Sequence, residues 1–87
     1  MDYNERKLAV LLIMENLGEA TAVEVWNSLE DDASIYTISM SLLRLHLQGL
    51  LNRYGYPKTY KITERGLKRI AWLQEEDEEE EEVEEEA

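Results

Sequence analysis

The chain has 87 residues and a formal net charge of −11, with nine Lys and Arg residues against twenty Asp and Glu residues. A domain this small buries only about 60% of the surface that its unfolded chain exposes, so we expect one domain at most. The absence of cysteine excludes disulfides and Cys-based zinc sites. The longest apolar run, residues 8–14, is too short to span a membrane, and we expect a soluble, cytoplasmic protein without a membrane partner.

The charge is distributed unevenly along the sequence. Residues 1–43 carry two bases against eight acids, whereas residues 44–74 carry seven bases against one acid. Residues 75–87 hold eleven acids and no base. The basic stretch predicts one positively charged surface that faces an anionic partner.

The first half of the chain predicts two helices. Residues 4–17 are rich in helix formers, and Gly18 stands where the first helix should end. Thr21 and Glu24 have the spacing of a capping box, which predicts a second helix running to about residue 29. In the "EVWNSL" segment of that helix, Trp26 is expected either in the core or with one edge at an interface.

The middle of the chain predicts a third helix followed by a β-hairpin. The helix should begin between Ser34 and Thr37 and end at Gly49. Two short runs with strand character, residues 51–54 and 59–62, are joined by Gly-Tyr-Pro-Lys, which is typical of a turn.

A last helix and an acidic tail complete the chain. Thr63 can cap the helix, although Gly66 occupies the position at which a capping box has Glu. Successive glutamates repel one another and oppose the helix dipole, so we expect the helix to fray after Gln74. The sequence therefore predicts one domain over residues 1–74 and a disordered acidic tail over residues 75–87. The tail either keeps the protein soluble or folds back onto the basic residues in place of phosphates.

The order of three helices, a hairpin and a fourth helix occurs together with two sequence motifs. They are Ile38-x-x-x-Leu42-x-x-Leu45-x-x-x-Gly49-Leu50 and Tyr60-Lys61-Ile62-Thr63-Glu64-Arg65-Gly66. Over residues 4–74 this combination resembles the winged helix-turn-helix of small MarR-like and PadR-like transcriptional regulators. The fold that the resemblance implies is mainly α with a small β-hairpin (α+β), with three helices, a hairpin wing and a C-terminal helix. The implied function is that of a dimeric DNA-binding transcriptional regulator.

The resemblance also implies which residues contact double-stranded DNA. The third helix of such proteins enters the major groove, and the wing lies against the phosphate backbone or in the minor groove. Carried over by position, the groove-facing residues are Thr37, Ser39, Met40, Leu43 and Arg44, and the phosphate-facing residues are Arg53, Lys58 and Lys61. The alternative for the basic residues is a structural hairpin with solvated side chains.

The third helix departs from the family because it is apolar on two sides. Opposite the face of Ile38, Leu42 and Leu45 lies a second stripe, formed by Tyr36, Met40, Leu43 and Leu47. This stripe either touches thymine methyl groups while phosphates supply the affinity, or binds a protein. The alternative function is therefore a winged-helix protein-interaction module that does not read DNA sequence and binds its partner through Met40, Leu43 and Leu47.

The first helix also has two apolar stripes. One is formed by Leu8, Leu11 and Leu12, and we expect it to face the core. The other, joined by Trp72 of the last helix, predicts a homodimer interface that consists of Val10, Ile13, Met14, Leu17 and Trp72. The alternative is a helix buried on all sides within one subunit.

Enzymatic chemistry finds little support in the sequence. His46 is the single histidine and flanks the buried stripe of the third helix, so we expect a packed imidazole rather than a catalytic base. It has no second histidine for a metal site and no cysteine nucleophile, and the chain has no Gly-rich phosphate loop. We expect no enzymatic activity, no metal and no cofactor.

Overall fold

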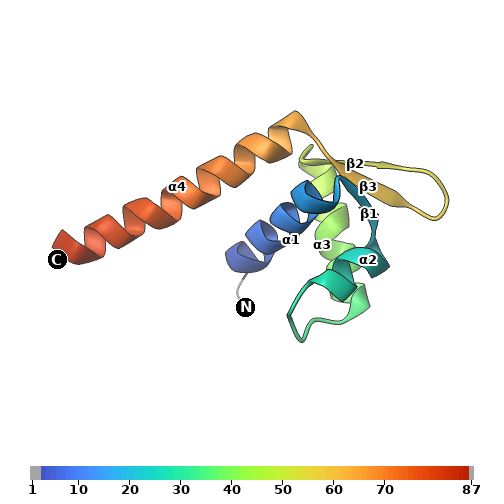
Figure 1. The fold of residues 1–87 in the computed structure, drawn as a ribbon, viewed down its shortest axis with the longest axis horizontal. Helices are drawn as coiled ribbons and strands as arrows, with labels where there is room; N and C mark the ends of the chain where they lie inside the picture. The colour runs from blue at the N-terminus through green and yellow to red at the C-terminus, as the bar shows by residue number, and fades with distance from the viewer. Residues whose placement is uncertain (1–2, 87) are drawn as a thin grey trace.

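The computed structural model describes the backbone of residues 3–86 and the side chains of residues 4–75. Its elements in chain order are α1 (Tyr3–Leu17), β1 (Glu19–Thr21), α2 (Ala22–Ser28), α3 (Ile35–Leu47), β2 (Leu51–Tyr54), β3 (Thr59–Ile62) and α4 (Glu64–Glu86) (Figure 1). The expected α+β class is confirmed: the described residues form four helices and one three-stranded antiparallel sheet. None of the helices in this part of the chain combines the length and the apolar character needed to cross a membrane.

The elements predicted from the sequence are present, and one strand is additional. The strands of the hairpin, β2 and β3, have the predicted bounds, and each helix begins within a few residues of its predicted start. β1 adds a third strand, which pairs with β3, so the order in the sheet is β1-β3-β2. The last helix was expected to fray after Gln74, whereas the backbone of α4 is helical to Glu86. The side chains of residues 76–87 lie outside the described part of the chain, and the division into a domain and a disordered tail stays a prediction.

The starts of α2 and α3 are fixed by their caps. The Oγ1 atom of Thr21 accepts a hydrogen bond from the backbone N–H of Glu24, and the Glu24 carboxylate accepts one from the N–H of Thr21 at 3.0 Å. This confirms the capping box. Ser34 caps α3 through its hydroxyl oxygen, which lies 3.2 Å from the backbone nitrogen of Thr37. These bonds satisfy N–H groups that the first turn of a helix leaves without partners.

The start of α4 explains why Gly66 replaces the glutamate of a capping box. Its N–H donates to the Oγ1 of Thr63 at 3.0 Å, and the N–H of Thr63 donates to the carbonyl oxygen of Leu50 at 3.0 Å. These bonds bring the first turn of α4 against the chain that leaves α3. A Cβ atom on residue 66 would lie only 2.3 Å from the Leu50 carbonyl oxygen. This close approach of two backbone segments requires glycine.

A single core fills the space between α1, α3, the sheet and the first turns of α4. The expected core face of α3 is confirmed, because Ile38, Leu42 and Leu45 are all buried. The thirteen buried apolar residues are Val10, Leu11, Met14, Ala20, Val25, Ile38, Leu42, Leu45, Leu50, Leu51, Tyr60, Ile70 and Leu73. The last of them marks where the contribution of α4 to the core ends among the described side chains.

The structure corrects the division of α1 into a core stripe and a dimer stripe. Val10 and Met14 of the predicted interface have no exposed surface and belong to the core of the chain itself, together with Leu11. These three residues span about 100° of the helix, so they form one face rather than two opposite ones. α1 packs against α4 and also against α2, β1 and β3. Leu12, which was expected to face the core, is 36% exposed instead.

The remaining residues of the predicted interface lie at or near the surface. Ile13 is half-buried against the core, whereas Leu17 and Trp72 are 42% and 53% exposed. The guanidinium of Arg69 lies over the Trp72 ring, 5.5 Å from its centroid. The predicted homodimer can therefore use these residues but not Val10 or Met14.

Trp26 lies at the surface instead of in the core. Its side chain is 40% exposed, and its indole N–H donates a hydrogen bond to the carbonyl oxygen of Ala33 at 3.0 Å. The bond joins α2 to the loop that precedes α3. Trp26 therefore holds this loop and does not set the spacing between the two helices from within.

Candidate functional site

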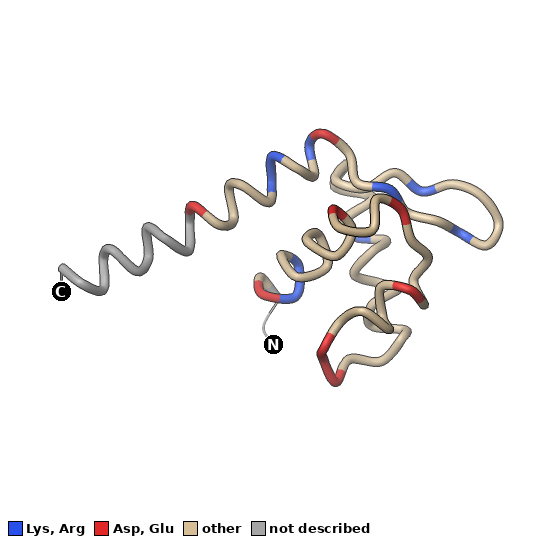
Figure 2. The backbone as a smooth tube through the Cα atoms, in the orientation of Figure 1, with Lys and Arg blue, Asp and Glu red and all other residues tan. Residues whose placement is uncertain are grey.

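Basic side chains gather on the hairpin and the start of α4. Figure 2 shows them along β2, β3 and the first turns of α4, and it shows acidic residues around the α2–α3 loop and both acidic and basic residues on α1. Arg53, Lys58 and Lys61 are all exposed. None of the three forms an ion pair with another residue whose side chain is described. Their charges are therefore available to an anionic partner.

The register of the sheet explains how the hairpin is anchored and why Lys61 faces outward. Tyr60 pairs with Ala20 on β1, and both are buried on the face that packs against the core. Lys61 pairs with Glu19 on one side and Asn52 on the other, on the opposite face. Because side chains alternate along a strand, burial of Tyr60 forces Lys61 to the solvent.

A hydrogen bond across the outer face of the sheet fixes β2 to β1. The Tyr54 hydroxyl donates to the Glu19 carboxylate, and the bond passes over β3. Because this carboxylate favours the protonated hydroxyl, the pKa of Tyr54 is raised above its ordinary value. The hairpin is thus held to the domain on both faces, by Tyr60 on the inside and by Tyr54 on the outside. Nothing in the sequence indicated the role of Tyr54, since Glu19 lies far away in the chain.

The residues that the resemblance assigns to the DNA groove differ in their accessibility. Arg44 is exposed, whereas Thr37, Ser39, Met40 and Leu43 are only partly accessible. The Thr37 hydroxyl is also within 3.1 Å of the Ser34 hydroxyl at the cap of the helix. Arg44 is therefore the one exposed side chain of the predicted groove-facing set.

Two large apolar side chains of α3 that this assignment does not include are highly exposed. Tyr36 and Leu47, at the two ends of the helix, are 72% and 75% exposed. With the partly accessible Met40 and Leu43 they form an outward stripe, which we call the apolar stripe of α3. Its existence was predicted from the helical periodicity. Such a surface offers van der Waals contacts but few hydrogen-bond donors.

The structure gives His46 a packing role. Its Nδ1 lies 2.9 Å from the carbonyl oxygen of Leu51, and the side chain is half-buried. A protonated Nδ1 donates to that carbonyl and ties the end of α3 to β2. Among the described residues, no group of three or more His, Asp and Glu side chains is arranged to hold a metal ion.

Comparison with protein-family models and with curated proteins gave no match for this chain. The function is therefore inferred from the site itself.

Proposed function

We propose that the protein is a winged helix-turn-helix transcriptional regulator that binds duplex DNA and has no catalytic role. The observation that carries the proposal is the projecting hairpin with three exposed bases, Arg53, Lys58 and Lys61, none of them in an ion pair with a described side chain. The order of the helices and the hairpin, which β1 leaves unchanged, further supports it.

In the proposed complex, α3 lies in the major groove and the hairpin lies against the sugar-phosphate backbone. An α-helix with its side chains is about 10–12 Å across, and the major groove of B-DNA is about 12 Å wide. Each basic residue that neutralises a phosphate releases counterions. Most of the affinity should therefore depend on salt and not on sequence.

The side chains of α3 limit how much sequence the protein can read. Arg44 is exposed and can donate two hydrogen bonds, either to a guanine or to a phosphate of the backbone. The neighbouring apolar stripe can touch thymine methyl groups but offers no donors beyond the Tyr36 hydroxyl. We propose that the protein prefers certain sites only modestly over random DNA.

The hairpin can be tested by fluorescence anisotropy with a labelled random-sequence duplex. The double variant Lys58→Gln with Lys61→Gln should weaken binding and reduce the slope of log affinity against log salt by about 1.8, since each phosphate contact contributes about 0.9. Lys68→Gln is the matched control, because Lys68 is an exposed lysine on α4 that pairs with Glu64 at 3.8 Å. If the hairpin variant binds as well as the control, the hairpin does not contact phosphates.

A protein-interaction module is the second candidate, and the exposure of Tyr36 and Leu47 favours it. Large apolar side chains that remain exposed in a stripe are typical of a protein-binding surface. Substitution of Met40, Leu43 and Leu47 by Ser should leave phosphate-driven DNA binding in place under the first proposal. Under the second, the same variant should lose its protein partner, whereas the hairpin variant should keep it.

We also propose that the protein is a homodimer, with Leu17, Trp72 and the edge of Ile13 in the interface. Leu17 and Trp72 are about half exposed in the single chain, and a second copy would remove their apolar surface from water. Light scattering at tens of micromolar should give twice the mass of one chain. A monomer under these conditions would overturn the dimer and leave the DNA proposal standing.

A further inference from the structure

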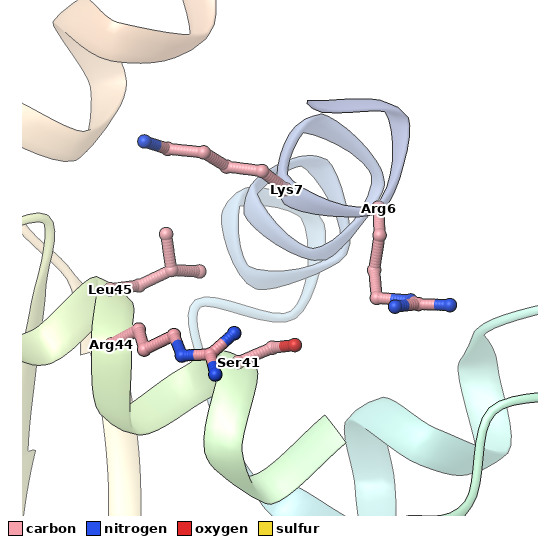
Figure 3. A pocket seen from close by; sticks show the side chains of 5 residues that line it. All are labelled: Arg6, Lys7, Ser41, Arg44 and Leu45. Atoms are coloured by element: carbon pink, nitrogen blue, oxygen red, sulfur yellow. The ribbon is translucent and has the colours of Figure 1, made fainter. Parts of the chain in front are cut away.

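A hollow between α1 and α3 brings together basic residues that are far apart in the sequence. It is lined by Arg6 and Lys7 of α1 and by Ser41, Arg44 and Leu45 of α3. In Figure 3 the Lys7 and Arg6 side chains extend to opposite sides of α1, and those of Ser41, Arg44 and Leu45 lie on α3 beneath it. The lining residues carry three positive charges, of which that of Arg6 is paired with Asp31, and the positive charges of Lys7 and Arg44 suit the hollow to an anion.

The charged groups around the hollow are held in place to different extents. Arg6 is paired through its Nε with the Oδ2 of Asp31 at 3.0 Å, and Lys7 donates to the Oε1 of Gln48 at 2.9 Å. Arg44 is exposed and forms no ion pair with a described side chain. An anion in the hollow would therefore meet Arg44 first, with Arg6 and Lys7 at its edges.

Two further residues that line the hollow, Leu45 and Ser41, favour a phosphate group over other anions. Leu45 is 3% exposed and forms an apolar floor, which lowers the local dielectric and strengthens charge-assisted hydrogen bonds. The Ser41 hydroxyl donates to the Thr37 carbonyl at 3.0 Å and can rotate to donate to a phosphate oxygen instead. A guanidinium can bind two oxygens of one phosphate at the same time.

The hollow lies where a DNA strand would pass if α3 occupied the major groove. In the view of Figure 1, α1 lies on one side of α3, and the hairpin projects on the other side. A helix that lies in the major groove has a sugar-phosphate strand on each of its flanks. The hairpin can reach one strand, and Ser41 and Arg44 lie on the flank of α3 that faces α1.

We propose that this hollow is a second phosphate-binding site, which takes a phosphodiester of the duplex backbone on the side of α3 opposite the hairpin. The inference rests on the proposed DNA-binding function and extends it to Arg6, Lys7 and Ser41. Two phosphate sites on opposite flanks would fix the orientation of α3 in the groove.

The first test is the salt dependence of duplex binding by the full chain, measured by anisotropy. Lys7→Gln should weaken binding several-fold and lower the slope of log affinity against log salt by about 0.9. Lys68→Gln is again the control and should retain the slope. If Lys7→Gln matches the control while the hairpin variant loses affinity, the second site is wrong and the proposed function stands. If no chain binds the duplex even at low salt, both are wrong.

The second test needs no variant, so it does not depend on the folding of one. Backbone amide resonances of the unmodified chain are followed while a short duplex is added. The amides of Lys7, Ser41 and Arg44 should shift together with those of the hairpin. Shifts confined to the hairpin would overturn the second site.

Titration with inorganic phosphate separates the two sources of the anion. We expect it to shift the amides of Ser41 and Arg44 only weakly and to compete poorly with the duplex. Two results together would mark a site for a small anion. Inorganic phosphate would saturate these shifts, and the Lys7→Gln variant would bind duplex normally. These results together would overturn the assignment to the DNA backbone.

Discussion

Gly66 of α4 lies against the backbone of the segment between α3 and β2. An added Cβ would meet the Leu50 carbonyl oxygen at 2.3 Å and the Cγ1 of Ile62 at 2.7 Å. The carbonyl belongs to the backbone and cannot rotate away, unlike the end of a flexible side chain. The sequence pattern Thr63-Glu64-Arg65-Gly66 therefore serves to pack α4 against the chain between α3 and β2.

Substitution of Gly66 by Ala should destabilise the domain. Overpacking of this kind costs about 1–3 kcal/mol, and the severe backbone contact puts the cost toward the upper end, above the roughly 1 kcal/mol that Ala gains over Gly in a helix. The free energy of unfolding in urea provides the measurement. Lys68→Ala, at an exposed position of the same helix, should change it little. Equal stability of the two variants would mean that the chain relaxes at this contact.

The hydrogen bond between Tyr54 and Glu19 predicts a dependence of stability on alkaline pH. Because the pKa of Tyr54 is raised above 10.0 in the folded chain, its contribution is fully present below that pH. The contribution is lost as the pH rises through the folded pKa. The stability difference between the unmodified chain and Tyr54→Phe should therefore shrink above about pH 10, the ordinary value for tyrosine. A difference that stays constant through this range would show that the bond does not affect titration.

Local chemistry explains why the sequence predicted some elements and missed others. The capping box at Thr21 and the start of the third helix between Ser34 and Thr37 each depend on neighbours in the sequence, and both are confirmed. The strand β1 has only three residues and forms because β3 offers it an edge. No local pattern could indicate a partner forty residues away.

The residues of α1 that belong to the core could not be predicted from local sequence either. Its periodicity identified the apolar residues but not which elements would cover them. Val10 and Met14 are buried because other elements of the same chain pack against α1, and this depends on where α4 begins. The start of α4 is set in turn by Gly66 and Thr63. The prediction of an open dimer face on these residues was therefore wrong for a reason that lies in tertiary packing.

The ion pair between Arg6 and Asp31 connects α1 to the loop before α3 and predicts an effect at acidic pH. The hydrogen bond from Arg6 lowers the pKa of Asp31 below its ordinary value of 3.8. The pair therefore stabilises the fold above that pH, and this contribution is lost as the pH falls through the lowered pKa. Asp31→Asn should destabilise the chain at neutral pH, and the difference should shrink in acid. Asp32→Asn, at the exposed neighbouring position, should show a smaller effect at every pH.

In the molecule as a whole, most basic residues lie in a different part of the sequence from most acidic residues. The candidate site lies in the basic part. The exposed bases of the hairpin could be predicted because seven of the nine bases lie in residues 44–74. The hollow between α1 and α3 could not, since it joins Arg6 and Lys7 to residues more than thirty positions away. The groove-facing set was predicted from position alone, and partial burial of four of its five members reduces what it can contact.

The acidic tail adds a prediction for the molecule as a whole. If residues 75–87 compete with phosphates for the basic surface, a chain that ends at Gln74 should bind random duplex more tightly than the full chain, most clearly at low salt. The truncated chain retains every core residue found among the described side chains, since Leu73 is the last of them. Equal affinities at low salt would show that the tail does not inhibit binding.

Whether the protein binds DNA is tested most directly by the anisotropy of a labelled random-sequence duplex, titrated with the chain that ends at Gln74 and with the full chain. We predict binding at about 50 mM salt that weakens by orders of magnitude at about 200 mM, because several basic residues would neutralise phosphates. No binding by either chain at the lower salt would contradict the proposed function. In that case the hairpin has a structural role, and the apolar stripe of α3 becomes the surface on which to seek a protein partner.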